Sequence, residues 1–138
     1  MTPQVIAERL LAQYEQADFE RLVEEFRPHL TVGLIAHLKK RVDEEKLKDL
    51  HLALRMATLA QSLATYISHA KAEALAYWAK GTALFHLSRY REALKCYQLA
   101  AAIYVAQEQK VALVGIQAPM LEVLRALGDH HACRFSST

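Results

Sequence analysis

Apolar residues recur every three or four positions along most of this chain of 138 residues, with polar residues between them. The clearest pattern covers residues 74–104, where small residues alternate with large ones on both sides of a polar corner at residues 88–90. A spacing of three and four places side chains on one face of an α-helix. The stretch therefore predicts two amphipathic helices that fold against each other as a hairpin.

The N-terminal third predicts two shorter helices. Thr2 is expected to cap the first helix, with Pro3 in its first turn. Asp18 is expected to cap the second helix, which must end before Pro28 because the residue before a proline avoids the helical conformation.

The same periodicity predicts five further helices, over residues 30–42, 47–67, 71–87, 90–107 and 110–127. Asp43 is a candidate N-cap, and Pro119 is expected to kink the last of these helices or to move its start. We expect a turn at Gly128 and a short helix after it. The chain is thus predicted to be all-α, with about seven helices stacked as antiparallel hairpins in a right-handed superhelix.

Residues of matching type also recur at an offset of 40 positions. Ala53, Ala93 and Cys133 are evenly spaced at this distance. The same offset joins three more pairs of small or apolar residues: Ala60 with Ala100, Leu84 with Leu124, and Leu87 with Leu127. A fixed period of this length indicates one supersecondary unit, used here about two and a half times.

The composition is that of a globular helical protein, with 53% hydrophobic residues and only 4 Gly and 3 Pro. The formal net charge is +2, whereas nucleic-acid-binding proteins usually show a clear basic excess. We interpret the mixed-sign stretch at residues 39–49 as a solvated helix end. Nucleic-acid binding is the less favoured alternative, through Lys39, Lys40, Arg41, Lys46 and Lys48.

Catalytic and metal-binding patterns are weak, and we expect no enzyme activity, cofactor or metal. His130, His131 and Cys133 could contribute to a metal site, but zinc needs about four ligands and no second pair is present. Cys96 lacks an evident base, and the phosphate-binding and hydrolase motifs are absent. Glu8 and Arg9 interrupt the N-terminal apolar pattern, so we expect no signal peptide, a cytoplasmic location and no membrane contact.

Residues 74–104 resemble a tetratricopeptide repeat (TPR), whose large, small and aromatic positions are filled by Tyr77, Gly81, Leu84, Tyr90, Ala93, Tyr97 and Ala100. The stretch departs from the family pattern at Lys80, Ser88 and Val105, and its period of 40 exceeds the usual ~34. The chain as a whole resembles the N-terminal TPR-like region of large bacterial CHAT-domain or signalling proteins. On this basis residues 1–138 form one TPR-like domain: atypical helices at 1–33, a degenerate repeat at 34–73, the best-matching repeat at 74–113 and a truncated repeat at 114–138.

The resemblance implies a non-catalytic scaffold that binds a protein or peptide partner in a groove, and a chain that is part of a larger protein. The first helix of each unit would line the groove, with an apolar or amphipathic segment as the occupant. The implied groove residues are Leu75, Trp78, Thr82, Phe85, His86, Glu122 and Arg125. Two alternatives stay open: neighbouring helices of the same chain cover these side chains, or the uncapped C-terminal repeat forms a homo-oligomer.

Overall fold

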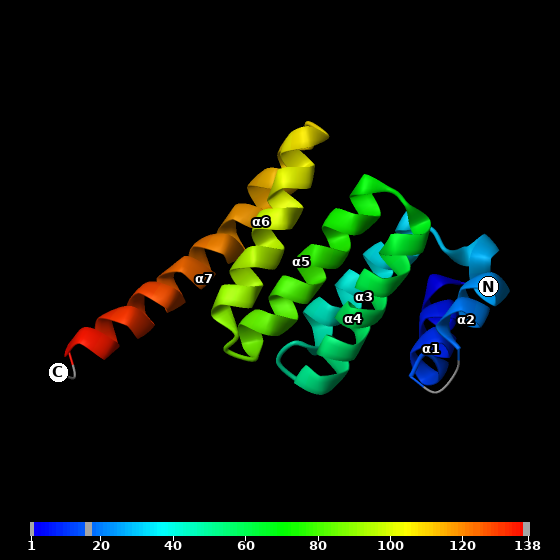
Figure 1. Ribbon diagram of the computed structural model, residues 1–138, viewed down its shortest axis with the longest axis horizontal. Coiled ribbons are helices and arrows are strands. Elements are labelled where there is room, and N and C mark those ends of the chain that lie inside the picture. Colours follow the sequence, from blue (N-terminus) through cyan, green and yellow to red (C-terminus); the bar gives the residue numbers. More distant parts are fainter. Residues whose placement is uncertain (1, 16–17, 137–138) are drawn as a thin grey trace.

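The computed structural model describes residues 2–15 and 18–136, with side chains described up to residue 128. Within these residues all regular structure is helical (Figure 1). The prediction of an all-α chain with about seven helices is therefore confirmed for the described part. The elements are α1 (Pro3–Gln13), α2 (Phe19–Phe26), the 3-10 helix η1 (Arg27–His29), α3 (Val32–Glu45), α4 (Leu50–Ile67), α5 (Ala70–His86), α6 (Tyr90–Ala106) and α7 (Lys110–Ser136).

The predicted caps of the two N-terminal helices are present. The Thr2 hydroxyl accepts a hydrogen bond from the backbone N–H of Val5 at 3.4 Å, and the Asp18 carboxylate accepts one from Glu20 at 3.1 Å. Each bond satisfies a backbone donor that the helix itself leaves without a partner. Helix α2 ends at Phe26, before Pro28 as predicted.

The prediction of Asp43 as an N-cap is wrong. Asp43 lies inside α3, where its carboxylate accepts a hydrogen bond from Lys39 Nζ at 2.9 Å. The charged stretch continues the helix because Val42 is fully buried and extends the apolar face of α3 by one more turn. Asp49 caps the next helix instead, by accepting from the N–H of Leu52 at 3.1 Å.

Helices α4 to α7 start at residues 50, 70, 90 and 110, so each start lies 20 residues after the previous one. The corners before the last three starts each contain one residue with positive φ: Ser68 (53°), Ser88 (62°) and Glu108 (54°). At the second corner the N–H of Arg89 bonds to the carbonyl of Leu84 at 2.9 Å, a bond typical of helix ends with a left-handed residue. The period of 40 residues in the sequence is thus two helices and two corners.

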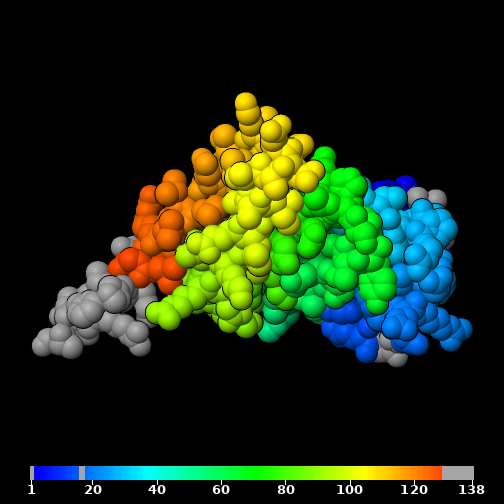
Figure 2. Space-filling view, turned by 45° about the horizontal axis from the view of Figure 1, so that its top comes forward, coloured from blue at the N-terminus to red at the C-terminus, as the bar shows by residue number. Residues whose placement is uncertain are grey.

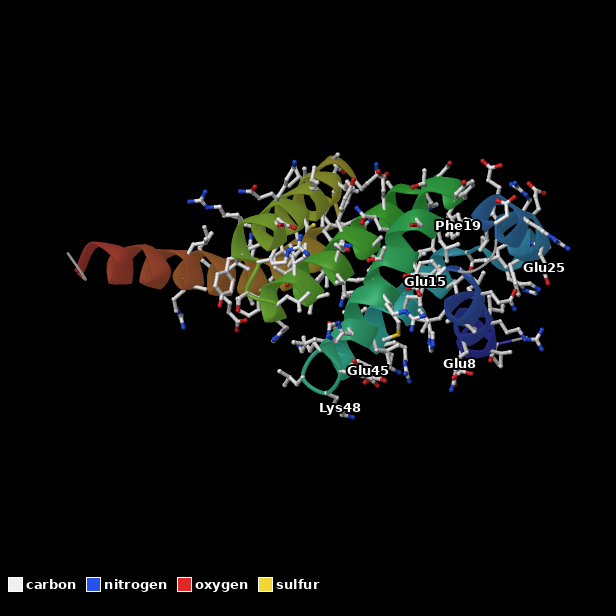
Figure 3. All side chains as sticks on the ribbon, turned by 60° about the horizontal axis from the view of Figure 1, so that its bottom comes forward. Glu8, Glu15, Phe19, Glu25, Glu45 and Lys48 are labelled. Carbon is white, nitrogen blue, oxygen red and sulfur yellow. The ribbon has the colours of Figure 1, made fainter. Side chains whose placement is uncertain are left out.

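Consecutive helices from α3 to α7 pack side by side and run in alternating directions (Figure 1). Helix α1 and the C-terminal part of α7 lie at opposite ends of the stack. One core joins α1 to α5, and a second joins α5, α6 and α7. At the N-terminal end the Arg55 side chain of α4 donates hydrogen bonds to the Glu15 carboxylate at 3.1 Å and to the carbonyl of Leu11 at 3.1 Å. These bonds connect the end of α1 to α4, and Glu15 is labelled in Figure 3.

The prediction of a turn at Gly128 is wrong, because α7 continues without interruption to Ser136. A Cβ built on Gly128 would meet nothing within 4 Å, so no neighbouring element directs the chain away from the helix axis there. A glycine inside a helix costs only about 1 kcal/mol relative to alanine and does not end a helix by itself. Pro119 also lies inside α7, and the start of the helix stays at Lys110.

Candidate functional site

Helix α5 lies at the centre of the candidate site. It contacts α3 on one side and α7 on the other, while α4 and α6 pack against its remaining surface. Trp78, Thr82 and Phe85 follow one another at spacings of four and three, which places them on the same face of α5. This face opens into a hollow bounded by α3 and α7.

The hollow has a volume of about 410 Å³. Its walls come from α3, α5, α6 and α7, so residues far apart in the sequence meet there. The lining residues are Lys39, Asp43, Lys46, Trp78, Thr82, Phe85, His86, Tyr97, Ala118, Pro119 and Glu122.

Five of the residues predicted from the sequence lie together in this hollow: Trp78, Thr82, Phe85, His86 and Glu122. The other two do not line it. Leu75 is half-buried and packs against the core of the first helices, and Arg125 is exposed on α7. Whether any of these side chains contacts a partner stays a prediction.

The wall from α3 was not predicted from the sequence. Lys39, Asp43 and Lys46 line the hollow at the α3 side. Their spacing of four and three places them on one helix face, but the sequence predicted a solvated helix end there. Contact with α5 could not be inferred from α3 alone, because the two segments are far apart in the chain.

Trp78 and Phe85, two of the aromatic side chains that line the hollow, are held in place but only half-buried. The Lys39 ammonium lies 4.3 Å from the ring centroid of Trp78, and the edge of that ring meets Tyr104 at 6.2 Å. The Phe85 ring packs on Tyr90 at 5.5 Å. Both side chains are half-buried, so neighbouring helices of the same chain cover each ring only in part.

Thr82 and Tyr97 form the closed floor of the hollow. Thr82 is only 5% exposed, and its hydroxyl donates to the carbonyl of Trp78 at 3.1 Å. The Tyr97 hydroxyl lies 3.0 Å from Thr82 Oγ1 and is therefore the donor in that pair. Burial raises the pKa of Tyr97 to about 12, so the phenol stays protonated at neutral pH.

Charged residues of both signs line the hollow, among them Lys46 at the C-terminal cap of α3 and Glu122 on α7. His86 lies within reach of both charges. Burial lowers the pKa of His86 below its ordinary value, Lys46 lowers it further, and Glu122 opposes the shift. The shift favours the neutral imidazole, and the hollow combines aromatic surface with charged residues of both signs.

The candidate chemical groups outside the hollow show no built site. Among the described residues, no three His, Cys, Asp or Glu side chains gather in a group that could hold a metal ion. The side chains of His130, His131 and Cys133 lie outside the described residues. Cys96 is half-buried in α6, and burial raises its pKa, which opposes formation of a reactive thiolate.

Two of the five basic residues in the stretch at the end of α3, Lys39 and Arg41, are paired with acidic neighbours. Lys39 bonds to Asp43 at 2.9 Å, and Arg41 lies 3.9 Å from Glu44 and 3.6 Å from Glu45. Figure 3 labels Glu45 and Lys48 near the corner between α3 and α4. Such mixed charge gives little attraction for a phosphate backbone.

One described helix segment, Lys110–Gly128 of α7, is long and apolar enough to cross a membrane by length and composition. Only 11% of the apolar part of this segment is buried. The segment also contains two charged residues, Glu122 and Arg125. The expected absence of membrane contact stays a prediction.

No family model, curated protein or solved structure matches this chain. The resemblance to tetratricopeptide repeats therefore depends on the residue spacing alone and stays a prediction.

Proposed function

We propose that this chain is a non-catalytic interaction module with a TPR-like arrangement of helices, which binds an apolar or amphipathic segment of a partner protein. The observation that carries the proposal is the hollow between α3, α5 and α7, in which Trp78 and Phe85 are held by the fold and still half-exposed. Aromatic residues in such positions are frequent energetic centres of protein interfaces. A cytoplasmic location is part of the same proposal.

Three features support the TPR-like arrangement. Helices start every 20 residues from Leu50 to Lys110. The first helices of successive hairpins, α3, α5 and α7, border a common hollow. The small residues Gly81, Ala93 and Ala100 are buried where α5 and α6 meet.

The charged residues that line the hollow restrict which partner segments would fit it. An apolar side chain would enter between Phe85 and Pro119, because these residues supply aromatic and aliphatic surface. An acidic group on one side of that anchor would approach Lys46, and a basic group on the other would approach Glu122. Complementary rim charges mainly affect orientation and association rate.

The test compares capture of partner proteins by the wild-type chain, by Phe85→Ala and by Leu47→Ala, with quantitative mass spectrometry. Leu47 is the matched control, because it is an apolar residue that is 80% exposed and lies outside the hollow. We expect at least one partner to be lost with Phe85→Ala and kept with Leu47→Ala. A peptide from that partner should bind the purified protein about tenfold more weakly when Phe85 is replaced.

The proposal fails if every captured protein is retained by Phe85→Ala and also by Trp78→Ala, while circular dichroism shows that both variants keep their helices.

A further inference from the structure

The hollow between α3, α5 and α7 is built from three layers of equivalent residues. These three helices run in the same direction, because consecutive helices of the stack alternate in direction. Each residue of α5 in the layers follows its counterpart on α3 by 39 positions and precedes its counterpart on α7 by 37. The layers are Lys39, Trp78 and Gly115, then Asp43, Thr82 and Pro119, and then Lys46, Phe85 and Glu122. All of them except Gly115 line the hollow, which therefore ends at the first layer.

The indole of Trp78 fills the first layer. A Cβ built on Gly115 would lie 3.2 Å from Cη2, an outer atom of the indole, so the ring reaches from α5 to the backbone of α7. On the α3 side the Lys39 ammonium lies 4.3 Å from the ring centroid. A single side chain thus joins three helices at this end of the hollow.

Lys39 is itself held over the indole. Its side chain is only 18% exposed, and its ammonium donates a hydrogen bond to Asp43 at 2.9 Å. The face of an aromatic ring attracts a cation in this position. Tyr104 of α6, which is 3% exposed, packs edge-on against the same ring at 6.2 Å. Together these contacts oppose rotation of the Trp78 side chain.

The absence of a side chain at Gly115 gives the indole its place against α7. Helix α7 packs mainly on α6, beside which it lies in Figure 2 (α6 yellow, α7 orange). A contact of 3.2 Å is shorter than Cβ atoms normally make, so a larger residue at 115 would displace the indole or the helix. A Cβ on Gly128 of the same helix would meet nothing within 4 Å. The need for glycine is therefore specific to the contact with Trp78.

We propose that Lys39 and Gly115 are positioning residues for Trp78, which they hold across the hollow as its end wall. An apolar side chain of the partner segment enters between Phe85 and Pro119 and stops at the indole. This role in binding rests on the function proposed above, whereas the position of the indole does not.

Acrylamide quenching of fluorescence tests the Lys39 contact, because Trp78 is the only tryptophan in the chain. Lys39→Met removes the charge and keeps an apolar stem. We expect the quenching rate constant to rise about twofold, because the indole loses the cation that holds it. Lys39→Arg should restore the wild-type value, since it supplies another cation that can pair with Asp43.

Lys40→Met is the matched control for this experiment. It removes the same charge from the next residue of α3, which is exposed and lies outside the hollow. Its quenching constant should equal that of the wild type. An unchanged constant in Lys39→Met, or a Lys39→Arg variant that is quenched as strongly as Lys39→Met, contradicts the proposal.

Gly115→Ala and Gly128→Ala test the contact with α7 as a matched pair, since each adds one methyl group inside the same helix. Gly128→Ala should raise the midpoint temperature of thermal unfolding by about 3 °C through helix propensity alone. Gly115→Ala should give no such rise and should increase the quenching of Trp78, because its methyl group displaces the ring. In a Trp78→Phe background the smaller ring leaves space, and Gly115→Ala should then give the rise of about 3 °C. Equal rises for the two glycines in the wild-type background would overturn the proposal.

These measurements need no partner, so their outcome is independent of the proposed function. If they give the expected results and the capture experiment fails, only the proposed function is overturned. With a peptide from a captured partner, Lys39→Met should weaken binding about threefold and Lys39→Arg should restore it. Equal affinity of Lys39→Met and the wild type would overturn the role of the end wall in binding.

Discussion

The α5–α6 hairpin and helix α7 use the same apolar pattern in different surroundings. Leu84 in α5 is 3% exposed, whereas Leu124, at the equivalent position 40 residues later, is 48% exposed. Helix α5 has neighbours on several sides, and α7 packs mainly on α6. The pattern therefore indicates which helix face can be buried, and the presence of a neighbouring helix decides whether it is buried.

The largest difference in the free energy of unfolding is expected when each of these two leucines is replaced by alanine. Leu84→Ala should lower the free energy of unfolding by about 3 kcal/mol, because it leaves a cavity in a packed core. Leu124→Ala should change it by less than about 0.5 kcal/mol, because water already reaches this side chain. Urea denaturation measures both values. Equal losses would show that α7 is covered as well as α5.

The glycines of the two regions should respond in opposite directions. A Cβ on Gly81 would lie 2.7 Å from the buried ring of Tyr97, so Gly81→Ala should destabilise the fold by about 2 kcal/mol. Gly128→Ala has free space and should stabilise helix α7 by up to about 1 kcal/mol. Thermal denaturation of both variants checks the signs. A neutral Gly81→Ala would mean that α5 and α6 can separate without cost.

The exclusion of water from the α5–α6 contact can be measured through the pKa of Tyr97. Burial raises its pKa to about 12 from an ordinary value of 10.0. The folded protein therefore holds this proton more tightly than the unfolded chain, and the associated stability is present below pH 10 and is lost as the pH rises toward 12. The loss should reach about 1.4 kcal/mol at pH 11.

The comparison for this experiment is Tyr97→Phe, which cannot ionise. Its free energy of unfolding should fall less between pH 9 and pH 11 than that of the wild type. Identical pH profiles in urea denaturation would show that the phenol is not buried as described.

The smallest expected effect concerns the corners. Ser88 has a φ of 62°, a conformation that glycine adopts without strain. Ser88→Gly should therefore raise the free energy of unfolding by about 0.5–1 kcal/mol. Ser62→Gly, inside α4, is the control and should lower it by roughly 0.5 kcal/mol. Thermal denaturation distinguishes the two, and a loss of stability in both would argue against a left-handed corner.

The positions of the helices could be predicted closely from the sequence. The helices starting at Tyr90 and Lys110 begin where the apolar pattern places them, and Thr2 and Asp18 cap their helices as expected. These features depend on interactions within a few residues of the chain, so the local sequence is sufficient. Gly128 shows the limit, because a glycine permits a turn but does not require one.

The candidate hollow could be predicted only on its α5 side. The spacing of Trp78 and Phe85 on one helix face is a local property, and the structure places both in the hollow. Lys39, Lys46 and Pro119 reach the same hollow through packing between helices that are distant in the sequence. Their contribution could not be inferred from any single helix.

The apolar periodicity and the capping residues thus account for an all-α chain with a 40-residue repeat. They act through hydrogen bonds and side-chain contacts inside one helix or one corner. The joining of α3, α5 and α7 around one hollow, and the uncovered face of α7, follow from the order in which the helices pack. Burial depends on which other surface is present, and an equivalent leucine is therefore core in α5 and surface in α7.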